Sequence, residues 1–131
     1  MTDEDTRGRL ALSFAAGLVD GDVDRMASAL HPDVRWSVPG TTAISGTAQG
    51  VDAVVDRARA IAASDVVVDL EHVLLGVETA AVLLHNTGNR GGVHLDEVVV
   101  VVFGFAEGAI VSADNVISDV AGLDAYFAAG A

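Results

Sequence analysis

The hydrophobic periodicity of the chain changes after Ser64, from about 3.6 residues to two. Before that point apolar side chains recur at helical spacing. After it they alternate with polar side chains, as in strands that have one covered face. Short turns separate the alternating segments, so successive strands are expected to pair as an antiparallel meander. The pattern predicts an α+β domain in which helices cover one face of a sheet.

The first half of the chain contains three predicted helices and one predicted strand. Leu10, Phe14 and Leu18 recur at intervals of four residues and mark one face of the first helix. Asp22 can cap the second helix, and Pro32 ends it because the residue before a proline avoids helical angles. The segments are a helix over 6–19, a short helix over 23–30, a strand over 34–38 and a helix over 51–63, with a loop of small residues over 41–50.

The second half carries four predicted strands, over residues 66–75, 79–89, 93–105 and 109–118. The run from Val98 to Phe103 has no polar residue on either side, so both faces of that strand need cover. The helices cover one face, and a second copy of the chain is the expected cover for the other, which predicts a homodimer. No internal repeat or low-complexity linker interrupts the chain, so we expect one domain over residues 1–131.

Composition narrows the classes of partner and chemistry. No run approaches the roughly 20 apolar residues of a membrane helix, and the acidic N-terminus does not read as a signal peptide, so we expect a cytoplasmic protein. The chain has no cysteine and its four histidines lack HExxH spacing, so we expect no metal and no cofactor. A net charge of −12 repels phosphate backbones and anionic lipid, so neither nucleic acid nor membrane is an expected partner. The expected ligand is a small neutral, cationic or mostly apolar molecule.

The order of several motifs carries a family resemblance over nearly the whole chain. A helix–Gly-Asp–helix start is followed by HPDVRWSVPG, by SGTAQG before a helix, and finally by EGAIVSADNVISDVAGLDAYF. This order resembles the SnoaL-like polyketide cyclase group of the nuclear transport factor 2-like superfamily, which includes ketosteroid isomerase and limonene-epoxide hydrolase. The resemblance implies a strongly curved sheet, wrapped with helices into a cone whose apolar interior holds a hydrophobic ligand.

Two kinds of function follow from the resemblance. One is a cofactor-free cyclase, isomerase or epoxide-opening enzyme that acts on a polyketide- or terpenoid-like molecule. The other is a non-catalytic binding or assembly module that keeps the pocket. Members of the superfamily do both, so the fold alone does not choose between them.

The catalytic residues of ketosteroid isomerase are replaced in this chain. Its oxyanion-hole tyrosine corresponds to Phe14, its catalytic base to Val38 and its second carboxylic acid to Val101. We therefore expect no useful isomerisation of a steroid double bond by that machinery.

The residues of limonene-epoxide hydrolase are also replaced, but by polar side chains. Its Arg-x-Asp strand corresponds to His85 and Thr87, its further aspartate to Asn115, and its tyrosine on the first strand to Trp36. The resemblance therefore implies a pocket with altered chemistry.

The turns predict which side chains share one face of the sheet, and the resemblance implies that this face looks into the cone. A three-residue turn over 90–92 pairs His85 with Glu97, and a similar turn over 106–108 pairs Val99 with Asn115. We predict that His85 is a general base whose tautomer is fixed by Glu97, and that Asn115 donates to a developing oxyanion. The predicted pocket lining is Phe14, Trp36, Val38, Thr87, Val99, Val101, Phe103 and Ile117.

Other interpretations of the same residues stay open at this point. A slip of one residue in the register would turn Glu97 outward and bring His94 and Asp96 into the cone. The contact between His85 and Glu97 also suits a purely structural cross-strand pair, and Trp36 also suits a plain core position.

Overall fold

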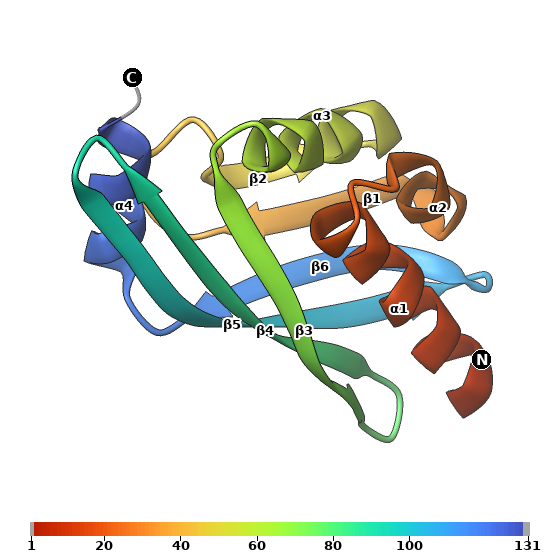
Figure 1. Cartoon of the computed structure of the whole chain (residues 1–131). Helices are drawn as coiled ribbons and strands as arrows, with labels where there is room; N and C mark the ends of the chain where they lie inside the picture. The colour runs from red at the N-terminus through yellow and green to blue at the C-terminus, as the bar shows by residue number, and fades with distance from the viewer. Residues whose placement is uncertain (1, 130–131) are drawn as a thin grey trace.

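The computed structural model describes residues 2–129, and within them three helices precede the predicted change of period at Ser64 and four strands follow it (Figure 1). The helices are α1 (Glu4–Val19), α2 (Val23–Ser28), α3 (Val51–Ala62) and α4 (Val120–Ala128). The strands are β1 (Leu30–Val38), β2 (Gly46–Gln49), β3 (Val66–Leu75), β4 (Ala80–Arg90), β5 (Val93–Ala106) and β6 (Ala109–Ile117). No helix within the described residues is both long and apolar enough to cross a membrane.

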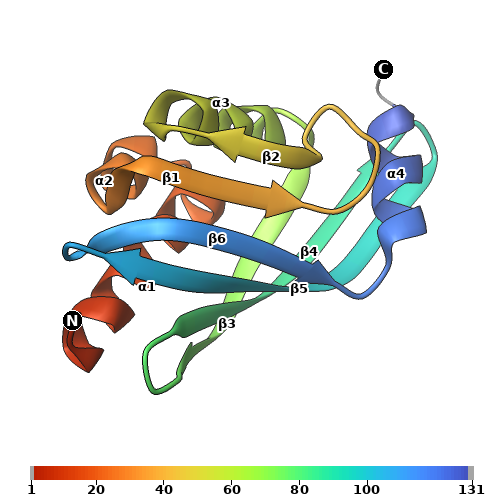
Figure 2. The same cartoon turned by 180° about the vertical axis from the view of Figure 1, so that it is seen from behind.

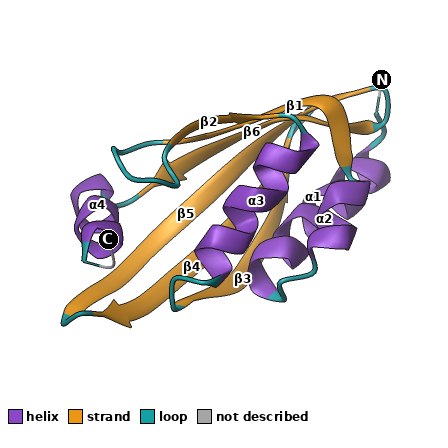
Figure 3. Cartoon of the chain, turned by 90° about the horizontal axis from the view of Figure 1, so that it is seen from above, coloured by secondary structure: helices purple, strands orange, loops and turns teal. Residues whose placement is uncertain are grey.

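The strands form one curled sheet in the order β2-β1-β6-β5-β4-β3. Neighbouring strands are antiparallel except β1 and β6, which are parallel. Figures 1 and 2 show the sheet bending around the helices, and Figure 3 shows α1, α2 and α3 gathered on its concave side. The predicted α+β class and the cone-shaped, strongly curved sheet are confirmed, with one parallel pair that the predicted meander did not include.

Three aromatic side chains form the centre of the core. The ring of Phe14 on α1 meets Trp36 on β1 and Phe103 on β5 edge to face, with centroid distances of 5.2 Å and 5.0 Å. All three side chains are fully buried. Such edge-to-face pairs add to the free energy of simple burial, so these contacts fix α1 against both halves of the sheet.

Strand β1 begins earlier than predicted because an irregularity accommodates its proline. The register between β1 and β6 shifts between Leu30 and Arg35, so Pro32 lies in a stretch without regular pairing to β6. Proline lacks an N–H and is tolerated in strands at such places. The second helix accordingly ends at Ser28 rather than at residue 30.

Two elements were missed from the sequence. Strand β2 pairs with β1, although its small residues show no alternation of apolar and polar side chains. Helix α4 lies against the end of the sheet, and Asp119 caps it by accepting a hydrogen bond from the backbone N–H of Gly122. Apart from Asp124 its residues are apolar or aromatic, so it presents no helical stripe that separates it from a strand.

The turn between β4 and β5 is one residue shorter than predicted. Arg90 pairs directly with Val93, and both turn residues, Gly91 and Gly92, have positive φ angles of 58° and 80°. Two such residues are typical of a type I′ turn, whose twist matches that of the strands. The whole of β4 is therefore displaced by one residue relative to the predicted register.

The turn between β5 and β6 is also a two-residue turn, through Glu107 and Gly108. A bulge beside Gly104 then adds a second one-residue shift. Asn115 consequently pairs with Val101 instead of the predicted Val99. Because two shifts of one residue restore the alternation, the side chain keeps the predicted inward direction.

Candidate functional site

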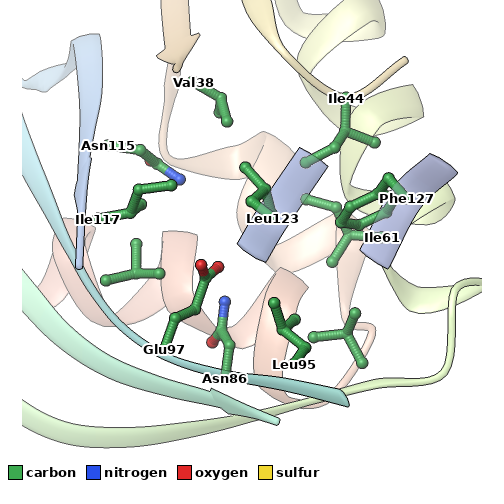
Figure 4. A pocket seen from close by; sticks show the side chains of 12 residues that line it. Val38, Ile44, Ile61, Asn86, Leu95, Glu97, Asn115, Ile117, Leu123 and Phe127 are labelled. Carbon is green, nitrogen blue, oxygen red and sulfur yellow. The ribbon is translucent and has the colours of Figure 1, made fainter. Parts of the chain in front are cut away.

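A small cavity lies between the inner face of the sheet, α3 and α4 (Figure 4). Its volume is about 30 Å³, which is room for one or two water molecules. Nine apolar side chains and three polar ones line it: Val38, Ile44, Ile61, Val66, Leu95, Val99, Ile117, Leu123 and Phe127, with Asn86, Glu97 and Asn115. A drug-sized ligand needs several hundred Å³, so binding one requires lining side chains to move.

Glu97 is the ionisable residue of this cavity. It lies on β5, points inward by the alternation of the strand, and is only 3% exposed. Its Oε2 atom has no hydrogen-bond partner within residues 2–129. Burial raises the pKa of the carboxyl group to about 7, and the nearby charge of Asp119 adds to the rise. The group therefore changes charge close to neutral pH.

Asn86 stands opposite Glu97 on the neighbouring strand β4. In Figure 4 its amide nitrogen lies on the side of the Glu97 carboxyl group. Its Oδ1 atom is buried and has no hydrogen-bond partner among the described residues. The predicted register put His85 in this place, so sequence reasoning missed Asn86. The paired glycines after Arg90 were the signal that could have found it.

Asn115 supplies the third polar group of the cavity, from β6. Its Oδ1 atom accepts a hydrogen bond of 2.8 Å from the indole Nε1–H of Trp36. The amide nitrogen points toward the interior of the cavity (Figure 4). Asn115 therefore offers the cavity a hydrogen-bond donor.

The predicted pairing of His85 with Glu97 is wrong. His85 stands opposite Val98, on the outer face of the sheet, because β4 is shifted by one residue. There its Nε2 atom lies 2.6 Å from Asp96 Oδ1, and its Nδ1 atom lies 3.7 Å from Glu71. The hydrogen bond to Asp96 raises the pKa of His85, helped by the charges of Asp96, Glu71 and Asp69.

The alternative register is wrong as well. His94 and Asp96 are exposed while Glu97 is buried, so β5 presents the predicted face inward, and of these two paired strands it is β4 that is displaced. Thr87, predicted to line the pocket, stands opposite Asp96 and so shares the outer face with His85. The physical cause is again the shorter turn.

The remaining predicted pocket residues divide into two groups. Val38, Val99 and Ile117 line the cavity. Four others are buried in the core but do not line the cavity: Phe14, Trp36, Val101 and Phe103. These side chains face the interior, as predicted, but they lie at a different level of the cone from the cavity.

Helix α4 closes one side of the cavity. Tyr126 anchors it by donating a hydrogen bond of 2.6 Å to the carbonyl oxygen of Ser64, and Asp124 accepts one of 3.0 Å from the backbone N–H of Thr41. Phe127, which follows Tyr126, lines the cavity and also borders an outer hollow of about 260 Å³ between α4 and residues 41–43. Phe127 therefore stands between the interior and solvent.

Solved structures share this fold. Bal32a, from a soil-derived mobile gene cassette, has a TM-score of 0.86 and 21% identity, with 95% of this chain and 98% of that chain covered. An NTF2-like protein from Burkholderia xenovorans has a TM-score of 0.78 and 17% identity, with 94% and 97% covered. A putative ketosteroid isomerase from Kribbella flavida has a TM-score of 0.74 and 20% identity, with 91% and 82% covered. At these identities the likeness establishes the NTF2-like fold.

Sequence comparison identifies the family. A protein of Mycobacterium tuberculosis, described as uncharacterized, is 30% identical over 133 aligned positions, with 98% of this chain and 100% of that protein covered. Residues 11–113 match the SnoaL-like domain. The match spans β1, most of the sheet and two of the three polar cavity residues, Asn86 and Glu97. The chain therefore belongs to the SnoaL-like domain family.

Proposed function

We propose that the protein is a cofactor-free enzyme that carries out acid–base chemistry on a hydrophobic, polyketide- or terpenoid-like substrate. The reaction class is cyclisation, isomerisation or epoxide opening. One observation carries the proposal: a buried carboxyl group, Glu97, faces an apolar cavity with one oxygen unpartnered among the described residues and a pKa of about 7. A cytoplasmic location belongs to the same proposal.

The pKa of Glu97 suits this role because a general acid–base group works best when its pKa lies near the operating pH. A carboxyl group with the ordinary value of 4.5 would be a weak base at neutral pH. Burying such a group without a partner also lowers the stability of the fold, and such groups concentrate at functional sites. Glu97 thus takes the role that the sequence suggested for His85.

The proton transfers can be written for a carbonyl substrate. The Glu97 carboxylate removes a proton from the carbon beside the carbonyl group, and the electron pair of that C–H bond moves toward the carbonyl oxygen. The amide N–H of Asn115 donates a hydrogen bond to the oxygen as it becomes negative. The protonated Glu97 then returns the proton to another carbon in an isomerisation, or to the new alkoxide after carbon–carbon bond formation in a cyclisation.

The alternative is a non-catalytic binding or assembly module. The observation that favours it is the volume of the cavity, about 30 Å³, which is far below that of an open ligand site. In this alternative Glu97 would alter affinity for a ligand but would move no proton.

Deuterium exchange distinguishes the two functions without knowledge of the substrate. Cyclohexanone in D₂O exchanges the hydrogens beside its carbonyl group, and an enzyme with a general base accelerates the exchange. We expect acceleration by the wild type and a loss of about 10²–10⁴-fold in Glu97→Gln. Asp96→Asn is the matched control, because it removes the adjacent carboxylate on the outer face. Equal rates in wild type, Glu97→Gln and buffer would support the binding module instead.

A further inference from the structure

We propose that Trp36 is a positioning residue that holds the amide of Asn115 with its N–H₂ end toward the cavity. The site would then select ligands that place a carbonyl oxygen, or another pure hydrogen-bond acceptor, at that point. The inference rests on the site of the proposed function and deepens it by naming the class of ligand.

The first argument is the donor and acceptor chemistry of the pair. Trp36 Nε1–H lies 2.8 Å from Asn115 Oδ1. An indole nitrogen only donates, whereas a primary amide has one accepting end and one donating end. Turning the amide around would bring two donors face to face and lose the hydrogen bond. The N–H₂ end of Asn115 is thereby directed away from the indole, toward the cavity (Figure 4).

The second argument is that the indole itself cannot turn. Trp36 is fully buried, with the ring of Phe14 edge-on at 5.2 Å. The guanidinium group of Arg57 lies 5.2 Å from the centre of the indole ring. Arg57 also donates a hydrogen bond of 2.7 Å to the backbone carbonyl of Trp36 and one of 3.2 Å to that of Ser45. These contacts from α1 and α3 hold the indole N–H in one direction.

The third argument is the backbone pairing that brings the two side chains together. Trp36 pairs with Ala113 in the parallel ladder between β1 and β6, and Asn115 lies two residues further along β6, on the same face. Residues two apart on a strand point in the same direction. The hydrogen bond is therefore set by the register of the sheet.

The chemistry of the cavity then defines the ligand. Asn115 offers a fixed donor, and Glu97 offers a carboxyl group that changes charge near neutral pH; the other lining side chains except Asn86 are apolar. A neutral ketone with a hydrogen on the adjacent carbon matches both groups, because its oxygen only accepts. A hydrocarbon of the same shape would leave the amide N–H without a partner.

The test compares two ligands of nearly equal shape, cyclohexanone and methylenecyclohexane, which has a CH₂ group in place of the oxygen. NMR titration gives their dissociation constants in the wild type, in Trp36→Phe and in Asn115→Leu. We expect the preference for the ketone to fall about tenfold in both variants. Val34→Ala, which removes buried volume from the same strand but leaves the hydrogen bond in place, should keep the wild-type preference.

A second readout needs no ligand. The chain has a single tryptophan, so one indole N–H signal reports on the hydrogen bond. We expect that signal to move upfield and to exchange faster with solvent in Asn115→Leu, but not in Val34→Ala. An unchanged signal, an unchanged ketone preference in Trp36→Phe, or no binding of the ketone at millimolar concentration would each overturn the inference.

The result of this test can be distinguished from the result of the test of the proposed function. A ketone preference that depends on Trp36, without catalysed deuterium exchange, would support the inference and count against Glu97 as a general base toward ketones. Catalysed exchange that depends on Glu97, with no such preference, would do the reverse.

Discussion

Glu97 and Asp96 are neighbours in the sequence, yet their carboxyl groups have different chemistry. Asp96 points outward and binds His85, whereas Glu97 points into the cavity and has a pKa of about 7. Adjacent residues of a strand face opposite sides of a sheet, so one carboxylate is solvated and the other is desolvated. The difference arises from position along the strand, since both side chains carry the same functional group.

The raised pKa of Glu97 predicts how stability depends on pH. In the unfolded chain Glu97 ionises at its ordinary value of 4.5, and in the folded protein at about 7. As pH rises between these values, the unfolded state loses the proton first, so this residue lowers the free energy of unfolding. The total is on the order of 3 kcal/mol above pH 7.

The substitution Glu97→Gln should remove that pH dependence. Denaturant unfolding at about pH 4, 6 and 8 gives the difference in stability between variant and wild type, in which other titrating groups cancel. We expect the free energy of unfolding of Glu97→Gln to increase relative to that of the wild type as pH rises through this range. A difference that is constant with pH would contradict the raised pKa.

The outer position of His85 gives a prediction that needs no ligand. Because the hydrogen bond to Asp96 raises the pKa of His85, Asp96→Asn should lower its titration midpoint in NMR. Glu97→Gln should leave the midpoint unchanged, since Glu97 lies on the other face of the sheet. A midpoint that responds to Glu97→Gln and not to Asp96→Asn would instead support the longer turn predicted from the sequence.

Among the elements, α4 closes one side of the cavity. It closes the interior with Leu123 and Phe127, and the hydroxyl group of Tyr126 ties it to the loop before β3. Gly88 on β4 permits this contact, because a Cβ atom there would lie 2.5 Å from the Tyr126 hydroxyl oxygen. The packing of α4 against the sheet therefore also keeps the cavity small.

Removing the Phe127 ring should open the cavity to the outer hollow. We expect Phe127→Ala to bind the neutral apolar dye Nile red about tenfold more tightly, because a larger fraction of molecules is open to the ligand. Dye fluorescence during titration measures the change. Leu12→Ala, which truncates an exposed side chain on α1, is the control. Equal affinity in Phe127→Ala and wild type would show that the ligand enters elsewhere.

For the whole molecule, the outer face of the sheet carries an apolar patch made of Val98, Val102 and Val116, of which Val116 is 56% exposed. We propose that a second copy of the chain covers it. The strong negative net charge of −12 opposes association of two copies, so apolar contact must supply the stabilisation.

Substitution at the patch tests the dimer. Val116→Lys should shift the protein from dimer to monomer in sedimentation velocity, because a dimer interface would bury the ammonium group among apolar side chains. Added positive charge reduces repulsion between two acidic copies, so dissociation would report loss of the apolar contact. Val77→Lys is the matched control, since Val77 is 94% exposed in the turn between β3 and β4. A wild type that is monomeric at micromolar concentration would contradict the proposal.

The sequence by itself determined the class of the fold and which side chains of β5 share a face, and the family resemblance indicated that this face points inward. The change of period separated helices from strands, and strict alternation placed Glu97, Val99, Val101 and Phe103 on one side. These features are local, because each depends on a few neighbouring residues and on the requirement that apolar side chains be buried. Asn115 also points inward as predicted, but this agreement results from two one-residue shifts of register that cancel.

Only the tertiary structure decided which residue meets Glu97. Both a two-residue and a three-residue turn are compatible with Arg90-Gly91-Gly92, and the choice displaces all of β4 by one position. Since side chains alternate with a period of two, that single step exchanges His85 for Asn86 inside the cone. The closure of the cavity by α4 could not be predicted from the sequence either, because it depends on contacts between segments far apart in the chain, such as Tyr126 with Ser64.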